Sequence, residues 1–212
     1  GTHNTAIGNV ALTDLTTGGG HTAVGSFALN DATTGSNNTA IGFQASRYLT
    51  TASNTVAIGY QAGSGSGGAS VMTGGNNIAI GAQSLKATTS GSENIAVGSY
   101  SLDANTTGNN NIGIGYAALG SNTSGIQNLA IGNNNGAMSS NTTGNYNVAL
   151  GSDALKSNTT ANYNDTVGFQ AGYSNTTGTW LTAFGSQAGY SQTTPNFNVA
   201  IGGQALYSTT TR

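Results

Sequence analysis

The chain has 212 residues, of which only 5% are charged, with a formal net charge of −2, 34 glycines and no cysteine. This charge gives no electrostatic basis for binding nucleic acid or an anionic membrane, and the lack of cysteine excludes disulfides and thiolate zinc sites. No apolar run approaches the roughly 18 residues of a membrane-spanning helix, so we expect no membrane insertion of this segment.

One short phrase recurs from the first residues to the last. If the glycine that ends each Ala-Ile-Gly-like triplet is taken as an anchor, successive anchors lie 17 residues apart, except for one interval of 22 and one of 19. A fixed period predicts a stack of like units, which we number as coils 1–12. Positions are counted from the anchor, so the preceding residue is at position −1. The anchors are Gly8, Gly25, Gly42, Gly59, Gly81, Gly98, Gly115, Gly132, Gly151, Gly168, Gly185 and Gly202.

The longer intervals predict insertions near residues 64–75 and 133–141 of an otherwise continuous array. We therefore expect residues 1–212 to form a single repeat domain. Because residue 1 already lies within the repeating text, we expect the domain to be a fragment of a longer fibre.

In each coil we expect a short strand, a turn, a second short strand and another turn. β-branched residues alternate before the anchor, and Gly and Asn punctuate every unit, which disfavours a helix. The anchor glycine should end the first strand, where positive φ or a close approach excludes a Cβ. An apolar pair such as Ala118-Leu119 comes next, followed by a Thr-Thr-Gly turn. The predicted class is all-β, a β-solenoid or β-roll of about twelve 17-residue coils.

Two apolar columns end each first strand, one of Ile, Val or Leu at position −1 and one of Ala at position −2. Neighbouring strand residues face opposite sides, and a 17-residue coil has room inside for only one column. We expect the large column inside and the small column outside, against other copies of the chain. The predicted interface residues are Ala6, Ala23, Ala40, Ala57, Ala79, Ala96, Ala130, Ala149, Ala183 and Ala200.

Asparagine fills position −4 in most coils, and its side chains should bond along the stack as an amide ladder. His21 stands in this column, where we expect it to replace an amide. His3 and His21 are too few for a metal site, so no metal or cofactor is predicted. Asn-x-Thr/Ser sequons in the turns would carry glycans only in a source that glycosylates them. They begin at Asn105, Asn122, Asn141, Asn158 and Asn175.

Two sequence stretches carry a resemblance to known families. "NTVAIG" at 54–59, followed by "YQAG", resembles the head repeat of trimeric autotransporter adhesins, and "NTTGNYNVALGSDAL" at 141–155 is similar to repeats of phage tail fibres and bacterial surface fibres. The resemblance implies a parallel homotrimer of β-rolls, displayed on a cell surface or virion. The 17-residue period is longer than in those heads, and the Thr-Thr-Gly turn is an addition.

The acidic residues are few and scattered, so we expect no enzyme. Asp14 and Asp31 alone share a column in adjacent coils, at position +6, where a solvated loop pair is favoured over a cation site. A glycan-cleaving enzyme would need paired carboxylates in a groove.

Position +5 is the most informative for binding. It carries Arg47, Lys86, Asp103 and Lys156, which predicts a solvent-facing column, and then Tyr173, Tyr190 and Tyr207. This aromatic ladder could stack on sugar rings or stabilise the coils themselves. Trp180 is a further candidate ligand-binding residue.

We therefore predict a structural and adhesive fibre segment, located outside the cell, on its surface or on a virion. Its expected partners are other copies of itself and a glycan or protein receptor. The alternative is an ice-binding solenoid that uses Thr arrays such as Thr16, Thr33, Thr50 and Thr106.

Overall fold

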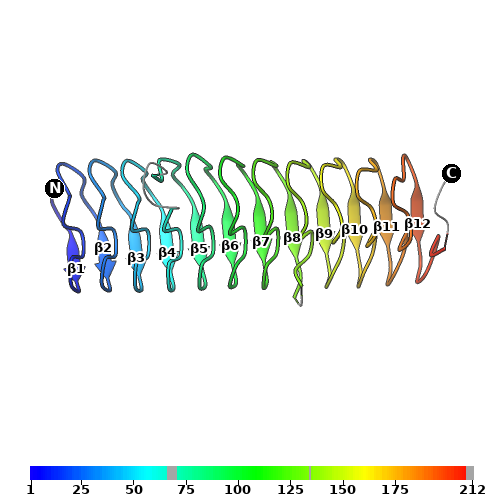
Figure 1. Cartoon of the computed structure of the whole chain (residues 1–212), viewed down its shortest axis with the longest axis horizontal. Coiled ribbons are helices and arrows are strands. Elements are labelled where there is room, and N and C mark those ends of the chain that lie inside the picture. Colours follow the sequence, from blue (N-terminus) through cyan, green and yellow to red (C-terminus); the bar gives the residue numbers. More distant parts are fainter. Residues whose placement is uncertain (66–70, 134, 209–212) are drawn as a thin grey trace.

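The computed structural model describes residues 1–65, 71–133 and 135–208. Within these residues the fold is a β-solenoid with one three-residue strand per coil and no helix. The strands lie side by side in chain order, so the first and last strands lie at opposite ends of an elongated molecule (Figure 1). The prediction of an all-β solenoid is confirmed. The strands are β1 (Thr5–Ile7), β2 (Thr22–Val24), β3 (Thr39–Ile41), β4 (Val56–Ile58), β5 (Ile78–Ile80), β6 (Ile95–Val97), β7 (Ile112–Ile114), β8 (Leu129–Ile131), β9 (Val148–Leu150), β10 (Asp165–Val167), β11 (Thr182–Phe184) and β12 (Val199–Ile201).

The strands form one parallel sheet in which equivalent positions of successive coils are paired. Ala40 pairs with Ala57, and the same register holds across both longer intervals, where Ala57 pairs with Ala79 and Ala130 with Ala149. The extra residues therefore leave the sheet undisturbed. Residues 66–70 of the first predicted insertion and residue 134 of the second lie outside the described residues.

The second strand predicted for each coil is not found in the described part of the chain. Positions +1 to +7, here called the return segment, form successive turns in which positions +2 and +4 are left-handed, as at Tyr100 (φ 60°) and Leu102 (φ 51°). Alternating left-handed residues are incompatible with a strand. The segment is still bonded from coil to coil, because Leu102 N donates to the Ala118 carbonyl oxygen at 3.0 Å.

The anchor glycine behaves as the sequence predicts. Eleven of the twelve anchors have φ between 114° and 137°, a region that side chains with a Cβ rarely adopt. A Cβ on Gly98 would also lie 2.5 Å from the carbonyl oxygen of Gly115 in the next coil. Both the conformation and the stacking distance therefore require glycine.

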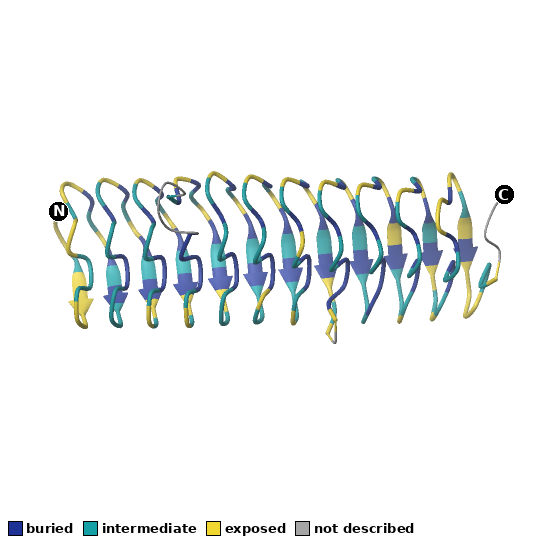
Figure 2. Cartoon of the chain, viewed as in Figure 1, coloured by how far each residue is buried: buried dark blue, intermediate teal, exposed yellow. Residues whose placement is uncertain are grey.

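The predicted orientation of the two apolar columns is wrong. Position −2 faces the interior, where Ala40, Ala57 and Ala79 are fully buried, and position −1 faces outward, where Ile58 and Ile80 are each 37% exposed. The alanines pack against the leucine at position +4 of the return segment, and in Figure 2 the buried colour marks both walls of the coil. The fully buried leucines at position +4 are Leu29, Leu85, Leu102, Leu119 and Leu155.

The narrow interior explains this reversal. Gly113 occupies position −2 of coil 7, and a Cβ there would lie 2.6 Å from Ser101 Oγ and 3.3 Å from Leu102 Cγ. Beside Ser101 and Leu102 there is not space even for a methyl group, in most other coils the interior holds only the methyl group of alanine, and an Ile side chain would force the walls apart. Strand alternation shows that the two columns face opposite sides, but the Leu volume decides which one faces in.

The amide ladder at position −4 is present and fully buried along much of the rod. Asn111 Nδ2 donates to Asn94 Oδ1 at 3.2 Å and to the Gly125 carbonyl oxygen at 2.8 Å. Asn128 repeats the pattern one coil on, with bonds of 3.1 and 2.8 Å. Each buried amide thus satisfies its neighbour, which removes the cost of burying polar groups.

His21 reproduces these bonds with an imidazole, as expected. Its Nε2 lies 2.9 Å from the Gly35 carbonyl oxygen, and the backbone N–H of Asn38 donates to its Nδ1 at 3.3 Å. The two contacts require the neutral ring with the proton on Nε2. Burial lowers the pKa of His21, and the hydrogen bond from its ring to the Gly35 carbonyl oxygen opposes this shift.

Candidate functional site

The outer face of the sheet carries a continuous apolar strip along much of the rod. Positions −3 and −1 of every strand point outward, and from β4 to β9 all of them are Val, Ile or Leu. Ile131 is 39% exposed and Phe184 is 42% exposed. Asp165 is the one charged residue at these positions. Monomeric proteins rarely expose so long an apolar strip, which therefore indicates an interaction surface.

The alanines predicted to form an oligomer interface do not lie on this surface. Nine of them are buried within the single chain, so no second chain can reach them; the nine are Ala23, Ala40, Ala57, Ala79, Ala96, Ala130, Ala149, Ala183 and Ala200. Ala6, in the terminal coil, is exposed. The reason is the narrow interior described above, and the surface available to another chain is the Val/Ile face instead.

The predicted tyrosine ladder at position +5 is formed. Tyr173, Tyr190 and Tyr207 stack with ring centroids 5.0 Å apart and interplanar angles of 11° and 17°. Lys156, in the same column, places its Nζ 5.5 Å from the centroid of the Tyr173 ring and 3.2 Å from Asp153 Oδ1. Tyr190 is covered on both faces, so stacking on a sugar ring is left to the ends of the ladder, while the coils gain aromatic packing.

Trp180 belongs to a separate ladder that the sequence reading missed. It stacks on Tyr163 with centroids 4.5 Å apart, and Tyr163 stacks on Tyr146 at 5.1 Å. Phe197 continues the ladder at 6.2 Å from Trp180. These four residues all occupy position −5, with left-handed φ between 56° and 59°. The 17-residue spacing of aromatic residues within the turn was the signal available in the sequence.

The threonines of the alternative ice-binding prediction use their hydroxyls within the rod. Thr16 Oγ1 donates to the Thr33 carbonyl oxygen at 2.8 Å, and Thr33 and Thr106 make the equivalent bond to the next coil at 3.1 and 3.0 Å. These side chains therefore clamp coil to coil, and their hydroxyl protons are not free to organise water on a surface.

Groups with catalytic or metal-binding chemistry are dispersed. Asp31 accepts a bond from Asn30 Nδ2, and Asp14 is exposed in the neighbouring coil. His21 is occupied inside the coil, and no group of three or more His, Asp or Glu residues that could hold a metal was found in the described ranges. In the same ranges, no helix has the length and apolar character to span a membrane.

The sequon asparagines are also interior residues. Asn105, Asn122, Asn141, Asn158 and Asn175 are fully buried. Asn122 Nδ2 donates to Asn105 Oδ1 at 2.8 Å, and Asn141 Nδ2 donates to Asn122 Oδ1 at 2.8 Å. All five share the column at position +7, which Asn141 reaches after the second insertion, and side-chain bonds link them from Asn105 to Asn158. A glycan on any of them is incompatible with the stacked coil.

Comparison with known proteins gives no relative: no family model, no curated protein and no solved structure matches the chain.

Proposed function

We propose that this chain is a segment of a structural and adhesive extracellular fibre, on a cell surface or virion, in which identical chains pack as a parallel homotrimer. The observation that carries the proposal is the outward-facing apolar strip of the sheet, which runs through consecutive strands β4 to β9 without a charged residue. A rod of uniform coils with few charges and no described catalytic cluster suits support and display better than chemistry.

A second copy of the chain is the occupant that fits this strip best. Parallel copies side by side have the same rise per coil, about 4.8 Å, so Val and Ile rows stay in step along the whole length. A partner with a different repeat would lose register within a few coils. Closed cyclic packing also hides the strip from every chain, which limits open-ended aggregation. The number three follows the resemblance to trimeric adhesin heads.

The test is the mass in solution, measured by light scattering. The unaltered chain should have the mass of three chains, and Ile80→Asp combined with Ile131→Asp should give single chains because each strip would then bury unpaired charges. Thr107→Asp, on an exposed turn away from the sheet, is the matched control and should stay trimeric. Circular dichroism must show that all variants keep β structure. A single-chain mass for the unaltered protein would reject the homotrimer.

A thermal-hysteresis assay addresses the ice-binding alternative, for which we expect no activity because the Thr16 and Thr33 hydroxyls are bonded to carbonyl oxygens of the next coil.

A further inference from the structure

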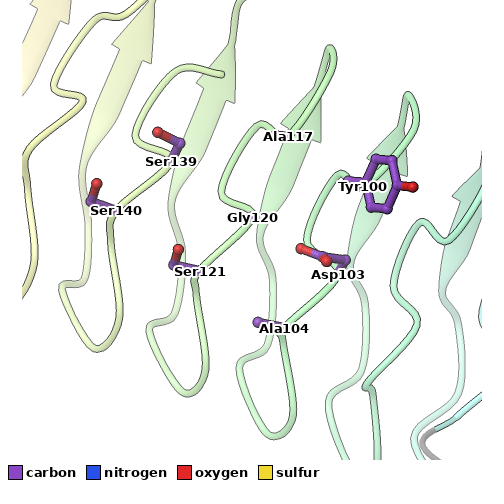
Figure 3. Close-up of a pocket in the computed structure, with 8 residues that line it drawn as sticks. All are labelled: Tyr100, Asp103, Ala104, Ala117, Gly120, Ser121, Ser139 and Ser140. Carbon is purple, nitrogen blue, oxygen red and sulfur yellow. The ribbon is translucent and has the colours of Figure 1, made fainter. Parts of the chain in front are cut away.

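A polar hollow interrupts the regular surface of coils 6–8. It has a volume of about 540 Å³ and is lined by Tyr100, Asp103, Ala104, Ala117, Gly120, Ser121, Ser139 and Ser140. Figure 3 shows Tyr100 and Asp103 at one end and the three serine hydroxyls on the next two coils. The volume lies within the range of about 300–1,000 Å³ that is typical of small-molecule sites.

Departures from the repeat create this hollow. At position +5, the charged side chains of Lys86, Asp103 and Lys156 are interrupted by Gly120 and then by Ser139. Ser139 takes the place equivalent to +5, because Ser121 N donates to its carbonyl oxygen. At position +2, Tyr100 is followed by Ala117. Both columns become small in the same two coils, next to the second insertion. The gap is therefore built by the sequence of these two coils.

Asp103 supplies a carboxylate that has no ion-pair partner among the described residues. It is partly buried, and the ion pair found in the described chain joins Lys156 to Asp153 instead. Burial raises the pKa of Asp103, while the backbone N–H groups of Asp103 and Ala104 and the charge of Lys86 oppose the rise. A partly desolvated acceptor of this kind can take hydrogen bonds from ligand hydroxyls.

Tyr100 differs from the tyrosines of the two ladders. Its ring meets Tyr116 edge to face, with centroids 5.8 Å apart and an interplanar angle of 73°, and it is 39% exposed. In the described chain it has no parallel-stacked neighbour, so its ring is not enclosed between two others. With Ala104 and Ala117 it offers apolar surface beside the polar groups.

From this combination we infer that the hollow formed by Tyr100, Asp103, Ser121, Ser139 and Ser140 binds a neutral saccharide. A sugar presents C–H faces for the tyrosine and alanines, hydroxyl donors for the carboxylate, and hydroxyl acceptors for the serines. The negative charge disfavours sialylated or phosphorylated glycans. The inference gives a ligand class to the adhesive part of the proposed function and rests on it, but the site lies within one chain and does not require the trimer.

The experiment uses immobilised lactose, maltose and diacetylchitobiose as probes, with sialyllactose as the charged counterpart of lactose. The unaltered chain should bind at least one neutral probe and should bind sialyllactose more weakly than lactose. Asp103→Asn should weaken binding about 10-fold or more, because a charge-assisted bond becomes neutral.

Ser139→Lys is the sharpest variant, because the same column already holds Lys86 and Lys156 in intact coils. It should fill the hollow and abolish binding while leaving the circular dichroism spectrum unchanged. Tyr190→Ala is the matched control in the tyrosine ladder and should bind normally.

Absence of binding to every neutral probe, or binding that survives Ser139→Lys, overturns the inference. Loss with Tyr190→Ala alone would instead assign the ligand to the tyrosine ladder. Light scattering on the same samples separates the two proposals: a single-chain protein that binds sugar rejects the trimer and leaves this site standing, and a trimer that binds no sugar does the reverse.

Discussion

Coils 1–3 and coils 6–10 solve the same packing problem with opposite chemistry. At position +7 coils 1–3 have Leu15, Ala32 and Leu49. Coils 6–10 have buried asparagines at this position, and their side chains bond to one another from Asn105 to Asn158. The backbone is the same in both regions, since anchor glycines of both have left-handed φ and the sheet register is continuous. A buried residue at position +7 therefore requires a residue of the same kind in the adjacent coils, either apolar beside apolar or amide beside amide.

The junction between the two regions supports this interpretation. Thr88 occupies position +7 of coil 5, between the apolar and amide stretches, and its buried hydroxyl has no hydrogen-bond partner among the described residues. A residue at a change of chemistry cannot be satisfied from both sides. In the same column Asn158 Oδ1 also has no hydrogen-bond partner among the described residues, since Asn175 Nδ2 donates to the Gly178 carbonyl oxygen of its own turn.

The largest effect should come from the feature that the two regions share. Gly98→Ala and Gly42→Ala should each destabilise the rod by about 3 kcal/mol or more, because a Cβ would lie 2.5 Å from the next coil's carbonyl oxygen in an already left-handed residue. Gly202→Ala keeps the strain but has nothing within 4 Å of the new Cβ, so it is the control for the clash. Denaturant unfolding measures all three, and equal losses at Gly98 and Gly202 would contradict the stacking explanation.

An exchange of the amide and apolar residues at position +7 should have the next largest effect on stability. Asn141→Leu should cost about 2–4 kcal/mol, since it removes the donor to Asn122 Oδ1 and the acceptor of the bond from Asn158 Nδ2, although Leu49 occupies the same column elsewhere. The reciprocal Leu49→Asn should be comparably destabilising. Hydrogen exchange would localise the opening to the mutated coil and its neighbours. Unchanged stability in either variant would show that a residue at position +7 does not need a residue of the same kind in the adjacent coils.

The surface ladders offer a milder comparison at position −5. Tyr163→Ala removes two stacked pairs and should cost about 1–3 kcal/mol. Asn54→Ala, in the same column of the early coils, loses an amide bond of 3.1 Å to Asn76 and should cost less than about 1 kcal/mol. Thermal unfolding of the two variants, each against the unaltered chain, checks the order. A larger loss of stability in Asn54→Ala than in Tyr163→Ala would show that the amide bonds of this column contribute more than the aromatic stacking.

The smallest effect concerns the imidazole that replaces an amide. The folded-state pKa of His21 lies below its usual value of 6.5, so the neutral ring is favoured by folding. Its stabilising contribution is complete above pH 6.5 and declines as the pH falls below that value, because protonation puts a donor against the Asn38 N–H. His21→Asn should remove this pH dependence of the unfolding midpoint between pH 7 and 5. An unchanged dependence would assign it to other groups.

Much of the fold could be predicted from the sequence, because a residue type that recurs at one position of the repeat indicates what the backbone requires there. The anchor glycine and the amide column, including His21, had one physical explanation each, and the structure confirms both. The inward column was ambiguous, because a strand shows only that Ala and Ile face opposite sides. The size of the interior depends on Leu102 and its equivalents, which come from the return segment.

The candidate site was predicted less well, for a different reason. Tyr173, Tyr190 and Tyr207 share a position and were expected to stack, whereas the hollow beside Asp103 arises from small residues where the repeat usually has larger ones. A motif search detects characteristic side chains, whereas Gly120 contributes to the hollow because it has no side chain. Such a site becomes visible only when neighbouring coils are placed in register.

The hydrogen bonds between coils point along the long axis of the rod, as in the bond from Leu102 N to the Ala118 carbonyl oxygen and in every strand pair. Tension between the two ends therefore acts on these bonds in series, and the first coil to yield releases its 17 residues as slack before the next is loaded. Under load the rod would therefore lengthen in steps, with energy dissipated at each step, in place of one abrupt rupture.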